Sequence, residues 1–167
     1  MYDIRHAEPS DHTAIVHLWH QGWHDAHAQL VPEGVLEYRT LECFWKWLQD
    51  SDDKLWVAVD NDVLGFVTTN GEELMKLYVL AKARGTGTAK ALLQHGESQI
   101  RNNGFSEAKV FCIAGNSRAE NFYLREGWVL NRTFQDQLWV PETATRNFAA
   151  RTRCYRKNLI SISMAES

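Results

Sequence analysis

One stretch, LYVLAKARGTGTAKALL at residues 77–93, constrains the fold more than any other part of the chain. It joins an apolar run typical of a strand to a loop with two glycines, Gly85 and Gly87, and then to a run typical of a helix. Glycines let the backbone approach a ligand closely, and a helix N-terminus offers free N–H groups with a partial positive charge. Lys82 and Arg84 add mobile positive charge at the same place. The stretch therefore predicts a strand, a loop suited to a pyrophosphate, and a helix.

Two common phosphate-binding motifs do not fit this loop. A mononucleotide loop, GxxxxGK[ST], needs a lysine followed by a hydroxyl, but here Lys90 is followed by Ala91. A dinucleotide loop, GxGxxG, has a small residue where this chain has Lys90. It also needs an acid at the end of the next strand, whereas Glu107 precedes that strand. A nucleotide ligand is therefore disfavoured, and on the loop alone a turn that binds nothing stays an alternative.

Periodicity and turn signals divide the chain into strands and helices. We expect strands at residues 2–7, 72–80, 108–115, 128–140 and 148–160, a hairpin at 54–70, and helices that begin near Ser10 or Asp11 and at 40–49, 88–103 and 117–127. The hairpin implies antiparallel pairing, and the strand–helix–strand unit across the glycine loop implies a parallel pair with a right-handed crossover. Because no repeat or linker interrupts the pattern, we predict a single α+β domain over residues 1–167 with a mixed sheet of the α/β type.

Composition excludes several classes of protein. The net charge of −3 provides no overall field that would attract nucleic acid or an acidic membrane. The three cysteines form no CxxC pair, which argues against a disulfide framework or a structural zinc site. The first residues lack the apolar core of a signal peptide, and no apolar run approaches the roughly 20 residues of a membrane span. We therefore expect a cytoplasmic protein whose seven tryptophans serve in core packing, or else in a substrate pocket or dimer face.

Two motifs together resemble a known family. LYVLAKARGTGTAKALL resembles the acetyl-CoA-binding motif of the GNAT N-acetyltransferase superfamily, whose loop is Q/R-x-x-G-x-G/A, with Lys82 at the first position. NSRAENFYLREGW, residues 116–128, resembles the family's next motif, N-x-x-A-x-x-F-Y-x-x-x-G-F/W, and a predicted strand separates the two. The resemblance implies a GNAT-like fold with a central mixed β-sheet of about seven strands flanked by about four helices. It also implies transfer of an acetyl group from acetyl-CoA directly onto a primary amine of a small molecule or peptide.

The resemblance further implies how acetyl-CoA would bind. The loop would hold the pyrophosphate, and the strand before it would pair through its backbone with the pantetheine arm, as an added strand does. An asparagine at the start of the second motif would hydrogen-bond the pantetheine region, and a tyrosine would lie near the sulfur. The predicted cofactor-binding residues are Leu77, Tyr78, Val79, Lys82, Arg84, Gly85, Thr86, Gly87, Thr88, Asn116 and Tyr123. No metal is expected.

Acyl transfer to an amine needs a neutral amine, a stabilised oxyanion and a proton for the leaving thiolate. Tyr123 is the predicted acid, and the backbone N–H of Val79 is the predicted oxyanion donor, because similar proteins leave it free where two strands diverge. Glu73 starts the same strand and matches the position of a catalytic glutamate in some family members, whereas Glu72 points the other way in a regular strand. A water chain without a single base stays the alternative. Cys112 is expected to be a small buried hydrophobe, since direct transfer needs no nucleophilic thiol.

The segment HLWHQGWHDAH places His17, His20, His24 and His27 on one stripe of the first predicted helix, opposite its apolar face. A metal site, a solvated polar face and a substrate-facing surface all stay open for this stripe. In the resembled family, the first two helices and their connection wall the acceptor cleft. Trp23, His24 and His27 are therefore candidate acceptor contacts.

Three other functions remain compatible with these motifs. The loop could serve a non-catalytic acyl-CoA-binding sensor module, an acyltransferase that uses a longer acyl-CoA donor, or, less readily, a nucleotide-binding protein. A homodimer is common in the resembled family, and neither nucleic acid nor a membrane is expected as a partner. The sequence leaves the acceptor amine open, because the residues that choose it vary among proteins of one fold.

Overall fold

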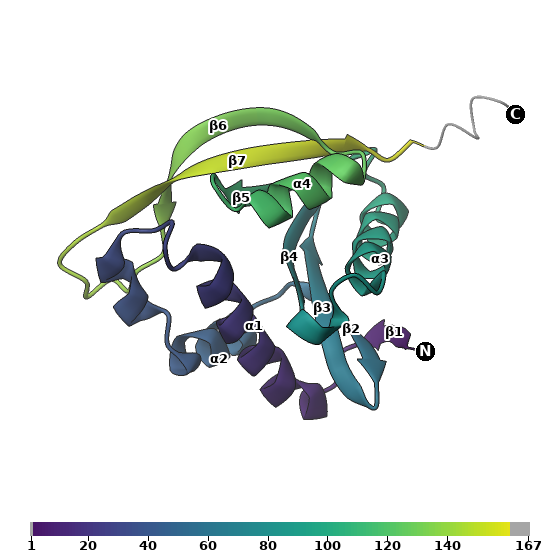
Figure 1. Cartoon of the computed structure of the whole chain (residues 1–167), viewed down its shortest axis with the longest axis horizontal. Coiled ribbons are helices and arrows are strands. Elements are labelled where there is room, and N and C mark those ends of the chain that lie inside the picture. Colours follow the sequence, from purple (N-terminus) through teal and green to yellow (C-terminus); the bar gives the residue numbers. More distant parts are fainter. Residues whose placement is uncertain (1, 161–167) are drawn as a thin grey trace, which may run out of the picture.

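A seven-stranded sheet with the strand order β1-β2-β3-β4-β5-β7-β6 forms the centre of the fold (Figure 1). The computed structural model describes residues 2–160. The strands are β1 (Asp3–His6), β2 (Lys54–Asp60), β3 (Asp62–Asn70), β4 (Glu73–Val79), β5 (Glu107–Ile113), β6 (Val129–Leu138) and β7 (Phe148–Asn158). The α-helices of this region are α1 (His12–His27), α2 (Leu41–Asp50), α3 (Thr88–Asn102) and α4 (Ser117–Arg125), and short 3₁₀ helices occur at η1 (Pro9–Asp11), η2 (Glu33–Tyr38) and η3 (Ala81–Ala83). The expected α+β fold class with a mixed sheet is confirmed.

The strand pairing agrees with the predicted mixture of parallel and antiparallel pairs. Strands β1 to β4 pair antiparallel in chain order, and the β2–β3 hairpin turns at Asn61, whose φ of 62° is a left-handed conformation that asparagine tolerates. Strand β4 pairs parallel with β5, while β5, β7 and β6 pair antiparallel. The single parallel pair therefore lies at the middle of the sheet, with antiparallel strands on both sides.

The parallel pair is very short. Its register joins only Glu73 to Lys109, and the Lys109 N–H donates to the Glu72 carbonyl at 3.0 Å. On the other edge of β4, the Leu80 N–H donates to the Leu64 carbonyl at 2.8 Å. Bonded and non-bonded pairs alternate along antiparallel strands, so the pair of Val79 with Gly65 is a non-bonded one. The N–H of Val79 therefore points away from β3, toward the opening between β4 and β5.

Two apolar clusters pack against the two faces of the sheet. Figure 1 shows α1 and α2 on one face and α3 on the other. Under α1 and α2, Trp19 packs edge-on against Phe44, with ring centroids 4.7 Å apart. Under α3 and α4, the fully buried Leu92 and Trp128 belong to the second cluster. Trp19 and Trp128 thus serve in core packing, as expected from the composition.

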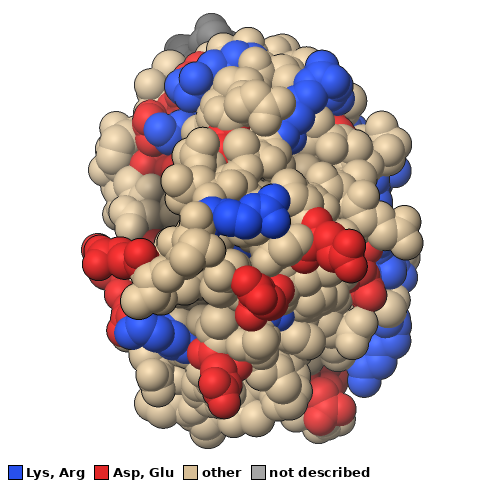
Figure 2. Space-filling view, turned by 90° about the vertical axis from the view of Figure 1, so that its left-hand side faces the viewer, with Lys and Arg blue, Asp and Glu red and all other residues tan. Residues whose placement is uncertain are grey.

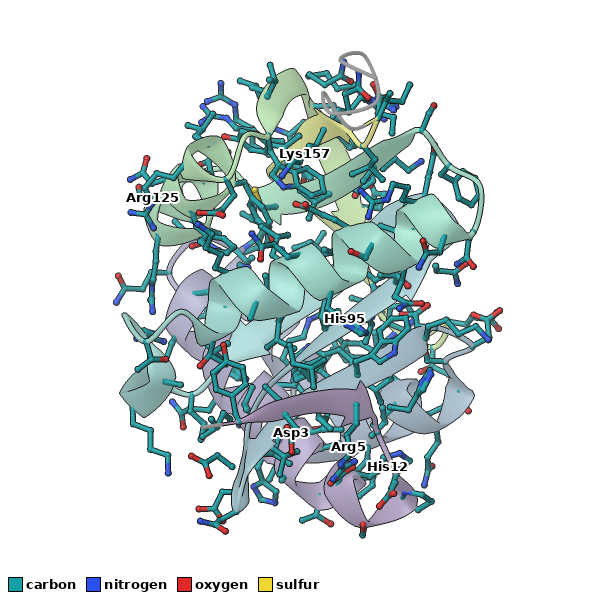
Figure 3. All side chains as sticks on the ribbon, turned by 90° about the vertical axis from the view of Figure 1, so that its right-hand side faces the viewer. Asp3, Arg5, His12, His95, Arg125 and Lys157 are labelled. Carbon is teal, nitrogen blue, oxygen red and sulfur yellow. The ribbon has the colours of Figure 1, made fainter. Side chains whose placement is uncertain are left out.

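The first helix starts at one of the two predicted N-cap positions, Asp11, but without the side-chain hydrogen bond of a cap. A 3₁₀ turn, Pro9–Asp11, precedes α1, and the Asp11 side chain does not cap the helix. Its carboxylate instead accepts hydrogen bonds from the Arg5 guanidinium at 2.7 and 3.1 Å and from the Glu8 N–H at 2.7 Å. Figure 3 shows Arg5 beside His12, the first residue of α1. The hydrogen bond from Arg5 lowers the pKa of Asp11, and the pair joins β1 to the start of α1.

Gly65 allows β3 and β4 to pack closely. A Cβ atom at this position would lie 2.7 Å from Val79 Cγ1 and 2.8 Å from the Tyr78 carbonyl oxygen. We predict that Gly65→Ala lowers the free energy of unfolding by about 1–3 kcal/mol, because backbone atoms of β4 must move. Urea unfolding of both proteins measures this change.

Gly96→Ala is the matched control for this prediction. Its added methyl would meet only side-chain ends, Leu74 Cδ1 at 3.1 Å and Val67 Cγ2 at 3.3 Å, and alanine also favours a helix. We expect a smaller loss of stability than for Gly65→Ala. An equal loss in the two variants would contradict the close approach of β3 and β4.

Candidate active site

A cavity of about 410 Å³ lies where β4, the glycine loop, α1 and α4 meet. It is lined by residues from three segments that are far apart in the sequence, since the glycine loop directly follows β4. Its lining residues are Gly22, Ala26, Leu77, Tyr78, Val79, Arg84, Gly85, Gly87, Ala89, Lys90, Asn116, Arg118, Ala119, Phe122, Tyr123, Arg125 and Glu126. The volume falls within the range of small-molecule sites.

The glycine loop presents an anion site to this cavity. Gly85 and Gly87 have φ values of 76° and 87°, which favour glycine, and a Cβ at either position would meet no atom within 4 Å. Gly87 precedes α3, and no side chain caps the helix. The first N–H groups of α3 lack partners within the helix and carry its partial positive charge. Open space around an uncapped helix N-terminus suits a phosphate group.

The free edge of β4 forms a second part of the cavity. Leu77 and Val79 both line it, and they occupy alternate, non-bonded positions opposite β3. Their backbone polar groups consequently face the opening left by the short β4–β5 pairing. An extended ligand with amide groups could hydrogen-bond this edge as an added strand does.

Helix α4 contributes an asparagine and a tyrosine from its two ends. Asn116 is the N-cap residue, and its Oδ1 accepts a hydrogen bond from the Ala119 N–H at 3.4 Å, which leaves the amide nitrogen for a ligand. Tyr123 lines the cavity but is 6% exposed, with its ring 5.6 Å from that of Trp128. Burial strongly raises the pKa of Tyr123, so its hydroxyl stays protonated at neutral pH and can act as a donor.

Helix α1 closes the opposite wall. A Cβ at Gly22 would lie 2.7 Å from Tyr78 Cδ1, so only glycine lets α1 approach β4 this closely. The Tyr78 ring stacks on Phe66 with centroids 5.8 Å apart, and burial raises its pKa. Tyr78 therefore contributes both its backbone and its side chain to the cavity wall.

Eight of the eleven predicted cofactor-binding residues line this cavity, and Lys82, Thr86 and Thr88 do not. Lys82 is exposed, with Nζ 3.9 Å from an Asp62 oxygen, and the Thr86 and Thr88 hydroxyls lie 2.9 Å apart. A register that begins two residues later satisfies Q/R-x-x-G-x-G/A in full, with Arg84, Gly87 and Ala89 at its defined positions, whereas Lys82 departs from Gln or Arg at the first position. All three line the cavity, so the geometry favours the later register over the expected start at Lys82.

Sequence reasoning missed several lining residues. Gly22 and Ala26 of α1 line the cavity, but the sequence predicts no binding role for either. Lys90, Arg118 and Arg125 bring positive charge to the same cavity, and Glu126 lies 3.8 Å from Lys90. Arg118 and Arg125 are seven residues apart on a predicted helix, a spacing that places them on one face. That spacing was the available signal for a basic rim.

The histidine stripe is not uniformly solvated. His27 is 8% exposed, beside the Trp23 ring at 5.1 Å, and burial lowers its pKa to about 4. Of the alternatives left open for the stripe, a solvated polar face therefore does not apply to His27. His24 Nε2 lies 2.7 Å from the Arg39 carbonyl, and the Arg39 guanidinium stacks 5.2 Å from the Trp23 ring. Within residues 2–160, no three His, Cys, Asp or Glu side chains are grouped to hold a metal.

His24 also lines a second cavity, of about 450 Å³, between the end of α1 and the start of α4. This cavity shares Ala26, Asn116 and Arg118 with the first one. Trp23 and His27 line neither of the two cavities. Of the three predicted acceptor contacts, only His24 is thus placed beside open space that continues from the main cavity.

Glu73 lies at the opposite end of β4 from Val79. These positions are six residues apart, a separation of about 20 Å along a strand, and Glu73 is not part of the cavity lining. Burial raises its pKa, while the charges of Lys109 and Lys76 act against that shift. Glu72 instead pairs with Lys109, at 3.3 Å.

Cys112 is half-buried against the apolar cluster under α3 and α4, and burial raises the pKa of its thiol to about 12. A thiol with such a pKa is almost entirely protonated at neutral pH, so it is a poor nucleophile. The structure therefore agrees with its expected role as a small apolar side chain.

The chain belongs to the GNAT family of acetyltransferases, because the family's acetyltransferase (GNAT) domain matches residues 25–141. The resemblance seen in the two motifs is thereby confirmed. Members of this family carry out acyl-CoA-dependent acetyl transfer, so the chain is an acyltransferase. No curated protein matches the sequence.

Solved structures of similar fold align with nearly the whole chain. An N-acetyltransferase from Staphylococcus aureus Mu50 is 20% identical, with 95% of this chain and 99% of that chain covered and a TM-score of 0.71. PaiA N-acetyltransferase from Thermoplasma acidophilum, in complex with coenzyme A, is 17% identical, with coverages of 95% and 99% and a TM-score of 0.66. The yncA protein from Salmonella typhimurium, with acetyl-CoA, is 15% identical, with coverages of 96% and 95% and a TM-score of 0.65. At these identities the likeness is one of fold.

In the part of the chain that the structure describes, every helix is too short or too polar to cross a membrane.

The buried His27 predicts a pH-dependent stability. Its pKa falls from 6.5 to about 4 on folding, so the unfolded chain binds more protons between these values. The contribution of neutral His27 to the free energy of unfolding should be fully present above pH 6.5. It should be lost, by up to about 3 kcal/mol, as the pH falls toward 4. Urea unfolding at pH 7 and pH 4.5 should show this loss in the wild type and a smaller loss in His27→Phe. The exposed His17, replaced by Gln, should leave the loss unchanged, and an unchanged loss in His27→Phe would contradict the assignment.

Proposed function

We propose that this chain is an acetyl-CoA-dependent N-acetyltransferase that acts directly on a primary amine of a small molecule or peptide. One observation carries the proposal: a single cavity joins an uncapped helix N-terminus, a free strand edge and a buried tyrosine hydroxyl. Pyrophosphate, pantetheine and thioester sulfur follow one another in acetyl-CoA in the same order. We further propose that residues 1–167 work as one domain, in the cytoplasm.

In this proposal each part of the cavity binds one part of acetyl-CoA. The N–H groups at the start of α3, with Arg84, bind the pyrophosphate. The backbone groups of Leu77 and Val79 pair with the pantetheine amides. Asn116 donates from its amide nitrogen to the same arm, because its Oδ1 caps α4. Lys90, Arg118 and Arg125 place further positive charge around the phosphates.

The proposed reaction is a direct transfer. The amine nitrogen forms a bond to the acetyl carbon, and the thioester oxygen accepts a hydrogen bond from the Val79 N–H as it gains negative charge. The carbon–sulfur bond then breaks, and the thiolate leaves. Tyr123 donates to that thiolate, since the buried hydroxyl is protonated and lines the same cavity.

The amine must lose a proton before or during its attack. Glu73 stays our proposed acceptor of that proton, since its raised pKa suits a base better than that of an exposed carboxylate. Its place at the far end of β4 means that the proton travels through water. A water chain that reaches solvent without Glu73 is the alternative.

The acceptor is proposed to enter beside α1 and the residues that follow it. His24 lies in the second cavity, which continues from the first at Ala26 and Asn116. Figure 2 shows the face that carries the connection after α1, and on it acidic and basic side chains lie among many uncharged ones. This mixture gives no strong field of one sign, so an amine acceptor is oriented by local groups such as His24.

Acetyl-CoA should raise the thermal unfolding midpoint. A ligand present at 100 times its dissociation constant adds about 2.7 kcal/mol of stability. We expect this rise with acetyl-CoA and CoA but not with NAD or ATP, and a much smaller rise in Arg84→Ala. Arg101→Ala, at the far end of α3, is the matched control and should keep the full rise. Absence of any shift with millimolar acetyl-CoA would refute cofactor binding.

Tyr123→Phe should lower kcat by about 100-fold or more, because the phenyl ring keeps the packing but cannot donate to the thiolate. The dissociation constant of acetyl-CoA should change little. Release of free CoA thiol from acetyl-CoA, with a panel of amino acids, diamines and short peptides, measures turnover. Tyr38→Phe, outside both cavities, is the control. Equal kcat in Tyr123→Phe and wild type would remove Tyr123 from the mechanism.

A further inference from the structure

Glu120 is a buried carboxylate on α4 that the proposed chemistry does not use. It is 6% exposed, and its two oxygens accept three hydrogen bonds. Oε2 accepts from the Gly115 N–H at 3.1 Å, and Oε1 accepts from Arg153 Nη1 at 2.8 Å and from the Tyr155 hydroxyl at 2.6 Å. One side chain thus joins α4, the turn before it and strand β7.

Glu120 lies between the two residues of α4 that serve the cavity. Asn116 is four residues before it and Tyr123 three residues after it, spacings that bring side chains to one face of a helix. The Gly115 N–H that Glu120 binds belongs to the residue directly before Asn116, and Gly115 has a φ of 101°. The position of Asn116 therefore depends on the same carboxylate as the turn that leads to it.

A second route connects Glu120 with Tyr123 through packing. The Tyr155 hydroxyl binds Glu120, and the Tyr155 ring lies 6.4 Å from the Tyr123 ring, at an interplanar angle of 30°. Helix α4 has only nine residues, and a helix this short is not stable without tertiary contacts. The orientation of the Tyr123 hydroxyl is consequently set by what holds α4 to β7.

We propose that Glu120 is a positioning residue, which holds α4 against β7 so that Tyr123 and Asn116 face the acyl-CoA cavity in the geometry needed for transfer. This inference rests on the proposed function, because it assigns Glu120 a role through those two residues. Arg153 and Tyr155 are the β7 partners in this hydrogen-bond network, since each donates to the same oxygen of Glu120.

The hydrogen bonds to Glu120 favour the ionised form of its carboxylate. Burial alone would raise the pKa of Glu120, but the hydrogen bonds from Tyr155, Arg153 and the Gly115 N–H outweigh it and keep that pKa below its ordinary value. A neutral amide at this position would keep one acceptor oxygen and present an N–H group to donors. Glu120→Gln is therefore expected to release α4 while preserving the size of the side chain.

Asp11 provides a matched control at the start of α1. Its carboxylate is also buried, at 7% exposure, and also accepts three hydrogen bonds, from the Arg5 guanidinium at 2.7 and 3.1 Å and from the Glu8 N–H at 2.7 Å. Asp11 and Arg5 line neither cavity, so Asp11→Asn breaks a comparable network away from α4.

The test measures kcat, the acetyl-CoA dissociation constant and the unfolding midpoint for wild type, Glu120→Gln, Tyr155→Phe and Asp11→Asn. Turnover is followed as thiol release with acetyl-CoA and the amine panel. We expect Glu120→Gln to lower kcat by about 10-fold to 100-fold, the size of effect that a misplaced catalytic group produces. Tyr155→Phe keeps the ring and should give a smaller loss, while Asp11→Asn should lower the midpoint but keep kcat.

A double variant separates positioning from general damage. If Glu120 acts through Tyr123, adding Glu120→Gln to Tyr123→Phe should lower kcat by less than it does in the wild type. Equal kcat losses in Glu120→Gln and Asp11→Asn, or full additivity with Tyr123→Phe, would overturn the positioning role. Absence of turnover in the wild type with every amine would instead overturn the proposed function, while wild-type turnover that Glu120→Gln retains would overturn only this inference.

Discussion

The short parallel pairing of β4 with β5 is the constraint on which the rest of the site depends. Because the register ends at Glu73 and Lys109, the remaining backbone groups on that edge of β4 have no strand beside them. Buried backbone groups are nearly always hydrogen-bonded, so such an edge requires water or a ligand to complete it. The glycine loop begins directly after this edge and turns the chain into α3. A strand edge and a helix N-terminus thereby face one cavity.

Close packing against β4 keeps this edge in place. Gly65 lets β3 approach Val79 on one side, and Gly22 lets α1 approach the Tyr78 ring from one face of the sheet. A methyl group at either position would lie 2.7 Å from a carbon atom of β4. The cavity wall therefore tolerates little displacement, whereas α4 on the other wall is short and is held through Glu120. One wall is fixed by packing and the other by hydrogen bonds.

Hydrophobic periodicity and turn chemistry predicted the order of strands and helices, and the two motifs predicted the fold, because both depend on local sequence. Contacts between segments that are distant in the sequence could not be predicted in the same way. Asp11 has the residue type of a helix cap, but Arg5 on β1 holds its carboxylate instead. His27 matches a polar stripe in the sequence, but in the fold it is 8% exposed, and the charge of Arg39 acts on it. Glu120 looks like a surface charge in a polar helix, and its partners Arg153 and Tyr155 come from β7.

The two sides of the cavity differ in whether backbone groups or side chains are available to bind a ligand. In the proposed function, the cofactor side relies on backbone groups, namely the N–H of Val79, the free start of α3 and the glycines with positive φ. Many sequences can present such groups as long as the fold is kept, which is consistent with similar folds at 15–20% identity. The proposed acceptor side relies on side chains such as His24, which lines the second cavity. Acceptor choice can therefore diverge while the geometry for acyl transfer stays the same.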